Sequence, residues 1–220
     1  MATRQTGALN AELNRFLKKY PKTDVMELLI ADTTGVLRCK RIRKSDFRKI
    51  FKDGFTLPGG TVLIDTIGDV VSGIPWSGDD GDPDTNASVV PGSLAPVPWA
   101  QKPSAQALFR FSTRDGKPFF ADPRCVLERA AQPISKMGLK IVMATELEFY
   151  LLHADTEQPT QRASLVPGVG RPQPGPQVYS PDDLWDIEGF LNDLNEVCEA
   201  QNIPAGTTTS EFAPGPFEIN

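Results

Sequence analysis

Apolar and polar residues alternate along the chain in patterns that predict both strands and amphipathic helices. The runs "DVMELLIA" (24–31) and "GVLRCKRI" (35–42) are joined by "DTTG", so they predict a β-hairpin with a glycine in its turn. One helix is expected before the hairpin at 9–20, and another after it at 45–54. Residues 54–104 are dense in Gly, Asp and Pro and are expected to be mostly loop.

The clearest helical pattern is "SPDDLWDIEGFLNDLNEVCEAQN" (180–202). Ser180 suits the N-cap of this helix, and Pro181 suits its first helical position. Apolar residues recur there at helical spacing and predict one buried face, made of Leu184, Ile187, Leu191, Leu194 and Cys198.

The pattern changes near residue 120, where "ADPRCVLERAAQPISKMG" (121–138) predicts a helix that begins after Asp122. We place a domain boundary there, which gives domains at 1–118 and 119–220.

The stretch "MATELEFYLL" belongs to a strand expected at 139–152. Residues two apart in a strand point to the same face, so Glu146 and Glu148 are expected side by side. This pair has two explanations, a solvated face of an antiparallel sheet or a site for a hard divalent cation such as Mg²⁺ or Mn²⁺. The opposite face of the strand is expected to enter the core with Leu147, Phe149 and Leu151.

A second acidic segment, "TSEFAPGPFE", carries Glu211 and Glu218 on either side of a turn that Pro214 and Pro216 impose. If its strand lies beside the first one, four carboxylates meet in one place. Their mutual repulsion would be relieved by divalent cations, which strengthens the metal interpretation without excluding a solvated face.

The overall composition is that of an ordinary globular protein. The chain has 220 residues and a net charge of −5, and it contains no apolar run long enough to span a membrane, so neither nucleic-acid nor membrane binding is expected. The basic run at 38–49 is interpreted as a solvated face. Three scattered cysteines predict neither disulfides nor zinc and favour a cytoplasmic location. His153 is the single histidine, so carboxylates are the favoured chemical groups.

Four segments in this order resemble the glutamine synthetase family along nearly the whole chain: "DGKPFFADPR", "TELEFYLL", "YSPDDL" and "SEFAPGPFE". The resemblance implies an α+β fold, with a β-grasp-like N-terminal domain followed by the first part of the family's catalytic antiparallel sheet and its helices. It also implies rings of subunits, with each active site between one catalytic domain and the next subunit's N-terminal domain.

The resemblance further implies a reaction and roles for single residues. ATP would phosphorylate the γ-carboxylate of glutamate, and an amine would then displace the phosphate. Glu148 and Glu211 would hold one Mg²⁺ or Mn²⁺ ion, with Glu218 on the same ion or its neighbour. Glu146 would hold the ion that bridges the ATP phosphates, and Tyr179 would line the amine site.

The chain also departs from the family pattern. Pro216 replaces the glutamine of the Ala-Pro-Gly-Gln segment. The loop that carries Asp-Gly-Ser-Ser in ammonia-using members is "LIDTIGDVVSG" here, which is more similar to relatives that join glutamate to polyamines or alkylamines. Asp65 and Asp69 are the candidates in this loop for a contribution to a neighbouring subunit's active site.

Family members are longer than this chain, and their nucleotide-binding histidine and arginines lie beyond Asn220. The 220 residues alone are therefore expected to be inactive. The alternative hypothesis is a short, non-catalytic protein that acts as an assembly or regulatory partner of full-length relatives.

Overall fold

The computed structural model describes residues 2–154, 157 and 159–220. Its contacts divide the chain into two compact units, Met1–Ile141 and Val142–Asn220. No helix in the described ranges is both long and apolar enough to cross a membrane. The presence of helices and sheets in both units confirms the predicted α+β class.

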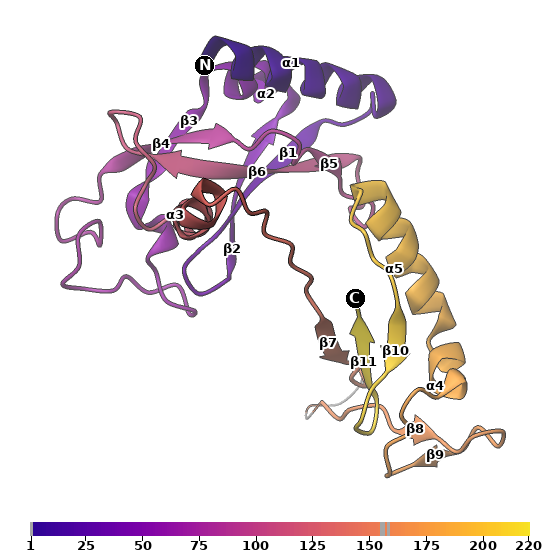
Figure 1. Cartoon of the computed structure of the whole chain (residues 1–220). Helices are drawn as coiled ribbons and strands as arrows, with labels where there is room; N and C mark the ends of the chain where they lie inside the picture. The colour runs from indigo at the N-terminus through magenta and orange to yellow at the C-terminus, as the bar shows by residue number, and fades with distance from the viewer. Residues whose placement is uncertain (1, 155–156, 158) are drawn as a thin grey trace. The chain divides into compact units, whose positions relative to one another are not determined.

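The first unit is a mixed sheet with helices on both faces (Figure 1). The strand order is β2-β1-β6-β4-β3, β5 pairs with β6, and β1 and β6 run parallel while the other pairs are antiparallel. The helices α1 and α2 lie on one face and α3 on the other. The elements are α1 (Ala2–Lys19), β1 (Val25–Ala31), β2 (Leu37–Arg43), α2 (Lys44–Asp53), β3 (Phe55–Pro58), the 3₁₀ turn η1 (Gly59–Val62), β4 (Asp84–Val89), β5 (Ala95–Pro96), β6 (Ser104–Ser112) and α3 (Pro123–Lys136).

Alternation along the strands of the first unit explains its core. In β1 the residues Met26, Leu28 and Ile30 are buried while their neighbours are half-buried, as expected for a strand that packs one face against helices. Phe47 and Phe51 of α2 are fully buried in the same core. The predicted β-hairpin is confirmed by the antiparallel pairing of β1 with β2.

The expectation that 54–104 is mostly loop is confirmed, although the short elements β3, η1, β4 and β5 lie within it. In β4 the buried positions are the small residues Thr85, Ala87 and Val89, which alternate with exposed polar ones. Small side chains give a weak hydrophobic signal, so the period of two was missed in the sequence.

The second unit has a small antiparallel sheet in the order β10-β11-β7 and a separate two-stranded pairing of β8 with β9. Its elements are β7 (Leu147–Tyr150), β8 (Ser164–Leu165), β9 (Pro172–Gln173), α4 (Pro181–Asp186), α5 (Glu188–Gln201), β10 (Thr208–Ser210) and β11 (Pro216–Ile219). Among the described residues of this unit, Ile187 and Phe217 are the buried large apolar side chains. The apolar interior of this unit is therefore thin.

Two expectations for the second unit are corrected. The strand expected at 139–152 is limited to β7, because β11 offers only four residues for it to pair with, and Glu146 precedes the strand. Leu147 is 64% exposed instead of lying in a core, while Phe149 packs against Phe190 and Phe217.

The single helix expected at 180–202 is interrupted at Ile187, which separates α4 from α5. Ile187 is buried as predicted, but α5 buries no residue completely. The remaining members of its apolar face, Leu191, Leu194 and Cys198, are half-buried.

Candidate functional site

The pairing of β7 with β11 brings two predicted metal ligands together. Glu148 lies directly opposite Glu218, and Phe149 lies opposite Phe217. Directly opposite residues of an antiparallel pair share one face, so the carboxylates stand on one side and the two aromatic rings on the other. The rings of Phe149 and Phe217 are 6.0 Å apart between centroids, which anchors this register.

Glu211 is held at the end of β10, next to the same face. Its backbone N–H donates to the carbonyl oxygen of Pro216 at 3.0 Å, and its carboxylate accepts from the Thr209 hydroxyl at 3.0 Å. Thr209 itself lies opposite Glu218 in the β10–β11 pairing. The Glu211 side chain is therefore directed to the neighbourhood of Glu218.

The pKa of Glu218 shows that these carboxylates influence each other. Burial raises the pKa of Glu218 above its usual value, and the negative charges of Glu146 and Glu211 raise it further, although a hydrogen bond from Asn220 opposes the shift. The structure thus brings Glu146, Glu211 and Glu218 within electrostatic reach of one another, and the strand register adds Glu148.

The turn between β10 and β11 is positioned by a close backbone approach. Gly215 has φ +79°, and a Cβ atom there would overlap the carbonyl oxygen of Arg162. The Gly215 N–H also donates to the Ser164 hydroxyl at 3.3 Å. This packing against the β8 segment fixes the turn that carries Glu211 on one side and Glu218 on the other.

The four glutamates fit a divalent cation in donor chemistry and charge. Carboxylate oxygens are the ligands that Mg²⁺ and Mn²⁺ prefer. Residues 172–220 contain no Lys, Arg or His, and none of the ion pairs found among the described residues includes Glu146, Glu148, Glu211 or Glu218. In the described part of the chain, however, no three or more His, Cys, Asp or Glu side chains are arranged closely enough to coordinate an ion as they stand.

Tyr179 lies beside the same sheet with an unusual backbone. Its φ of +57° is uncommon for a bulky residue, and such conformations cluster at functional sites. The Tyr179 N–H donates to the Ser210 carbonyl oxygen at 2.9 Å, and the next N–H, of Ser180, donates to the Ser210 hydroxyl at 2.7 Å. Tyr179 is 68% exposed, and its hydrogen-bond partner Ser210 directly precedes Glu211 in the sequence.

Asp65 and Asp69 belong to the first unit and not to the unit that carries the glutamates. The Asp65 carboxylate accepts the N–H groups of Ile67 at 3.0 Å and of Asp69 at 2.8 Å, so it stabilises its own loop. Asp69 is exposed and its carboxylate makes no hydrogen bond within the described ranges. The structure therefore groups these two aspartates with each other, and Asp69 is the one whose carboxylate faces solvent.

Sequence reasoning missed the hydroxyl groups that position the site. Thr209 binds the Glu211 carboxylate, and Ser210 holds the backbone at Tyr179 and Ser180. The run "TTTS" immediately before Glu211 was the available signal, because hydroxyl side chains next to a carboxylate commonly form such bonds.

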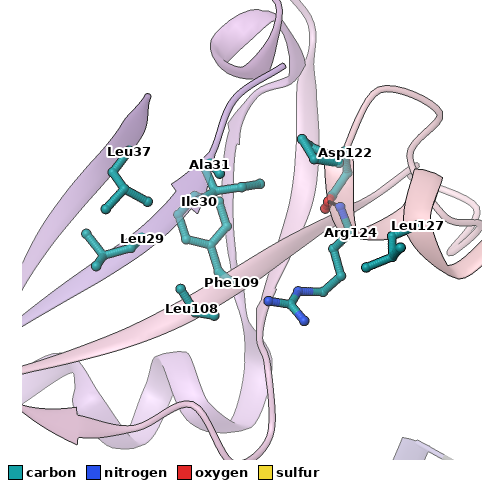
Figure 2. A pocket seen from close by; sticks show the side chains of 10 residues that line it. Leu29, Ile30, Ala31, Leu37, Leu108, Phe109, Asp122, Arg124 and Leu127 are labelled. Carbon is teal, nitrogen blue, oxygen red and sulfur yellow. Dashed lines mark hydrogen bonds between the residues drawn. The ribbon is translucent and has the colours of Figure 1, made fainter. Parts of the chain in front are cut away.

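A cavity of about 290 Å³ lies elsewhere, against the sheet of the first unit (Figure 2). Figure 2 shows Leu29, Leu108 and Leu127 around this space, with the Arg124 side chain extending along it. The Asp122 carboxylate at its edge accepts three backbone N–H groups and caps α3. The cavity contains none of the predicted site residues and is mainly an apolar recess.

Comparison with known proteins places these features in a family context. Residues 120–220 match the glutamine synthetase catalytic domain. The chain is 37% identical over 219 residues to gamma-glutamylputrescine synthetase of Escherichia coli, covering 99% of this chain and 46% of that protein. It is 28% identical over 214 residues to glutamate–isopropylamine ligase of a Pseudomonas species, covering 93% of this chain and 44% of that protein. The chain thus spans about half the length of these curated relatives.

Solved structures agree in fold. A novel glutamine synthase homolog superposes with a TM-score of 0.72 at 16% identity, over 90% of this chain and 43% of that one. A complex of GmaS with ADP gives a TM-score of 0.68 at 17% identity, over 94% of this chain and 43% of that one. At these identities the likeness establishes the fold alone.

Proposed function

Because the chain belongs to the glutamine synthetase family, we propose that it forms the metal-holding and amine-facing part of a ligase that joins an amine to the γ-carboxylate of glutamate at the expense of ATP. Two relatives support this reaction class, because their names describe glutamate ligation to putrescine and to isopropylamine. The chain spans about half of each, so the proposal concerns the protein in which these residues work.

One observation carries the proposal: the pairing of β7 with β11, which gathers the acidic residues of two distant segments on one sheet face. Glu148 and Glu218 are opposite each other, and the pKa of Glu218 is raised first by burial and further by the nearby charges of Glu146 and Glu211. A group of like charges without basic partners is costly unless a cation is bound, so a solvated face explains this arrangement less well than a cation site does.

We assign Glu148, Glu211 and Glu218 to a divalent cation near the glutamate and amine, and Glu146 to a cation near the ATP phosphates. When bound, Mg²⁺ or Mn²⁺ would neutralise charge on the transferred phosphoryl group. The protein's own part is to fix the carboxylates: Thr209 orients Glu211, and the aromatic pair behind β7 and β11 keeps Glu148 and Glu218 in register.

The reaction itself has two steps. A γ-carboxylate oxygen of glutamate attacks the γ-phosphorus of ATP, which forms γ-glutamyl phosphate and releases ADP. The amine nitrogen then attacks the γ-carbon, phosphate leaves, and the nitrogen loses a proton. The exposed ring of Tyr179 can lie against an ammonium group before it reacts, because aromatic faces attract cations.

We further propose that Asp69, with Asp65 holding its loop, acts in the site of a neighbouring subunit in a ring of identical subunits. Asp69 supports this role because its exposed carboxylate lies on a loop that Asp65 rigidifies. The cytoplasm is the proposed location, since ATP and glutamate are available there.

The test of this function is product analysis on the polypeptide isolated from its native cells. It is incubated with ATP, Mg²⁺ or Mn²⁺, glutamate, and either 1,4-diaminobutane, isopropylamine or ammonium. We expect ADP, phosphate and one γ-glutamylated amine in equal amounts, and none of them when glutamate is omitted. The proposal is contradicted if, with each of the three amines, the same amount of ADP forms in the presence and in the absence of glutamate.

A further inference from the structure

Positive charge is concentrated at the start of the chain. Residues 1–53 contain 13 Lys and Arg against 6 Asp and Glu, a net charge of +7, whereas residues 54–220 have a net charge of −12. A charge asymmetry of this size within one chain points to an anionic partner. The overall net charge of −5 does not show it, and the basic run at 38–49 is only one part of it.

The structure collects much of this charge on one layer of the first unit. The helices α1 and α2 lie on the same face of the sheet and pack against each other (Figure 1). The Lys44 N–H donates to the Asp24 carbonyl oxygen at 2.9 Å, and the Lys44 ammonium group donates to the Pro21 carbonyl oxygen at 2.8 Å. These bonds hold the beginning of α2 beside the residues that follow α1.

Both helices carry basic side chains on the side that faces away from the sheet. In α2 the residues Phe47 and Phe51 are buried in the core, and in α1 the residues Leu13 and Phe16 are buried. Exposed basic residues occupy the opposite side of each helix and the turn after α1. We define the basic surface by six of them: Lys18, Lys19, Lys22, Arg48, Lys49 and Lys52.

The carboxylates of the same segment do little to neutralise this surface. Within the described part of the chain, no ion pair includes a member of the basic surface. Glu12, Asp24 and Asp32 are engaged by other groups of the first unit. Asp46 and Asp53 of α2 are exposed. The six like charges therefore repel one another, and an anionic ligand would relieve that repulsion.

The beginning of α2 adds to the positive potential. Arg43 holds the N-cap position, and no side chain caps the free N–H groups there. The N-terminal end of a helix carries a partial positive charge, so it ordinarily favours acidic residues. Here Arg43 and Lys44 begin the helix, although Asp46 lies in its first turn. Two cations at this end are unfavourable by themselves and become favourable beside an anion.

We propose that the basic surface binds the phosphate backbone of double-stranded DNA without reading its sequence. Contacts of Lys and Arg with phosphates supply essentially all of such binding. A local surface is sufficient in a chain of net negative charge, because salt screens charges beyond a Debye length of about 8 Å at physiological ionic strength. The proposal departs from the expectation that net charge alone gives, and it is independent of the ligase function.

The chemistry of the surface favours DNA over a protein or a membrane. Among the described residues of 1–53, Leu37 of β2 is the one large apolar side chain that is exposed, and it lies outside the two helices. Protein interfaces centre on apolar and aromatic residues and are poor in lysine. Helices that lie on membranes bury an apolar side among the lipids. A lysine-rich surface without exposed apolar residues suits neither partner.

The surface also favours a DNA duplex over single strands and over RNA. Single strands are held largely by bases that stack on exposed aromatic rings. Tyr20, at the end of α1, is half-buried, and its ring already contacts the Phe16 ring, at 4.9 Å between centroids, and the Lys19 ammonium group, at 5.2 Å. RNA duplexes are recognised partly through 2′-hydroxyl groups. Lys and Arg, which only donate hydrogen bonds, are sufficient for the phosphates of DNA.

The experiment measures fluorescence anisotropy of a labelled DNA duplex of about 20 base pairs, titrated with the intact chain at NaCl concentrations from about 50 to about 200 mM. ATP and glutamate are absent, and EDTA prevents divalent cations from joining DNA to the acidic residues. The main variant is the triple substitution Arg48→Gln, Lys49→Gln and Lys52→Gln on the exposed side of α2. A second variant, Lys18→Gln with Lys22→Gln, tests the other helix independently.

The matched control is the triple substitution Arg114→Gln, Lys136→Gln and Lys140→Gln. These residues are also exposed and belong to the first unit, but they lie outside the basic surface. One arginine and two lysines are lost in both triple variants, so the net charge changes equally.

We expect the logarithm of the wild-type affinity to fall linearly with the logarithm of the salt concentration, with a slope of about −4, which corresponds to about five phosphate contacts. The α2 variant should weaken binding by at least about tenfold at the lowest salt concentration and bring the slope about 3 closer to zero. The α1 variant should also weaken binding, by about three- to tenfold, whereas the control should stay within about twofold of the wild type.

Equal losses in the α2 variant and the control, both with the wild-type circular dichroism spectrum, would overturn the inference, because binding would then follow net charge alone. Absence of salt-dependent binding to the duplex would overturn it as well. Tighter binding to single-stranded DNA, to phosphatidylserine vesicles or to poly-L-glutamate than to the duplex would assign the surface to another partner and refute the proposal for DNA.

Discussion

Glu148 and Glu218 face each other across the β7–β11 pair, although 70 positions separate them in the sequence. Like charges directly opposite each other weaken a sheet. The pKa of Glu218 is raised by burial and, to a smaller extent, by the negative charges of Glu146 and Glu211. A bound cation would offset the repulsion among these carboxylates. Carboxylate oxygens are the ligands that Mg²⁺ and Mn²⁺ prefer.

The first prediction concerns the sheet without metal. Glu148→Gln should increase the free energy of unfolding by about 0.2–1 kcal/mol in the presence of EDTA, because it removes one of two opposed charges. Glu196→Gln, at an exposed position of α5, is the control and should change stability less. Thermal unfolding of the three proteins measures the difference, and a loss of stability in Glu148→Gln would show that the carboxylates do not repel.

The second prediction concerns the β1–β2 turn of the first unit. Burial opposes ionisation of Asp32, but hydrogen bonds from Thr34, Arg38 and Val36 outweigh it and hold the pKa of Asp32 below its usual value of 3.8. Because the folded pKa is lowered, the stability that Asp32 contributes is complete above the usual value and is lost as the pH falls through the folded pKa.

Asp32→Asn should therefore lower the free energy of unfolding by about 2 kcal/mol at pH 7. The difference from the wild type should shrink as the pH is lowered below 3.8. Urea denaturation at a series of pH values measures this, and a difference that stays constant down to the lowest pH would contradict the assigned cause.

The third prediction separates the backbone of Tyr179 from its side chain. Tyr179→Gly should stabilise the protein by about 0.5–1 kcal/mol, because glycine accepts the φ of +57° without strain. Tyr179→Phe keeps that strain and should leave stability nearly unchanged.

If the ring lines the amine site, Tyr179→Gly should raise the KM for the amine more than Tyr179→Phe does. Unchanged KM values in both variants would remove Tyr179 from the site.

The fourth prediction tests the turn that supports the site. Gly215→Ala should destabilise the protein by about 2 kcal/mol or more, since the new Cβ would overlap the Arg162 carbonyl oxygen and the φ of +79° disfavours alanine. Gly168→Ala is a matched control with a similar φ of +69° and open space around the Cβ position. Equal losses in the two variants would mean that the close approach to Arg162 contributes nothing.

Much of the fold follows from local patterns in the sequence. The β-hairpin was predicted correctly because "DTTG" lies between two alternating runs, and Asp122 and Ser180 cap helices as their types suggest. The break at Ile187 was not predictable, because apolar spacing continues through it and tertiary packing decides where the helix ends.

The candidate site was predictable in its residue types and not in its geometry. The sequence left open whether the second acidic strand lies beside the first, and the pairing of Glu218 with Glu148 answers that question. The position of Glu146 outside the strand depends on the short length of β11, and the role of Asp65 depends on backbone N–H groups that no pattern reveals. Assignment of Glu146, Glu148, Glu211 and Glu218 to metal therefore remains a prediction.

The most direct test of the account is calorimetric titration of the chain with Mn²⁺. Glu148→Gln and Glu211→Gln should each weaken Mn²⁺ binding by at least about tenfold, because each removes a carboxylate ligand, while Glu196→Gln should bind as the wild type does. Equal Mn²⁺ affinity in all four proteins would contradict the account and reduce the acidic face of β7 and β11 to a solvated surface.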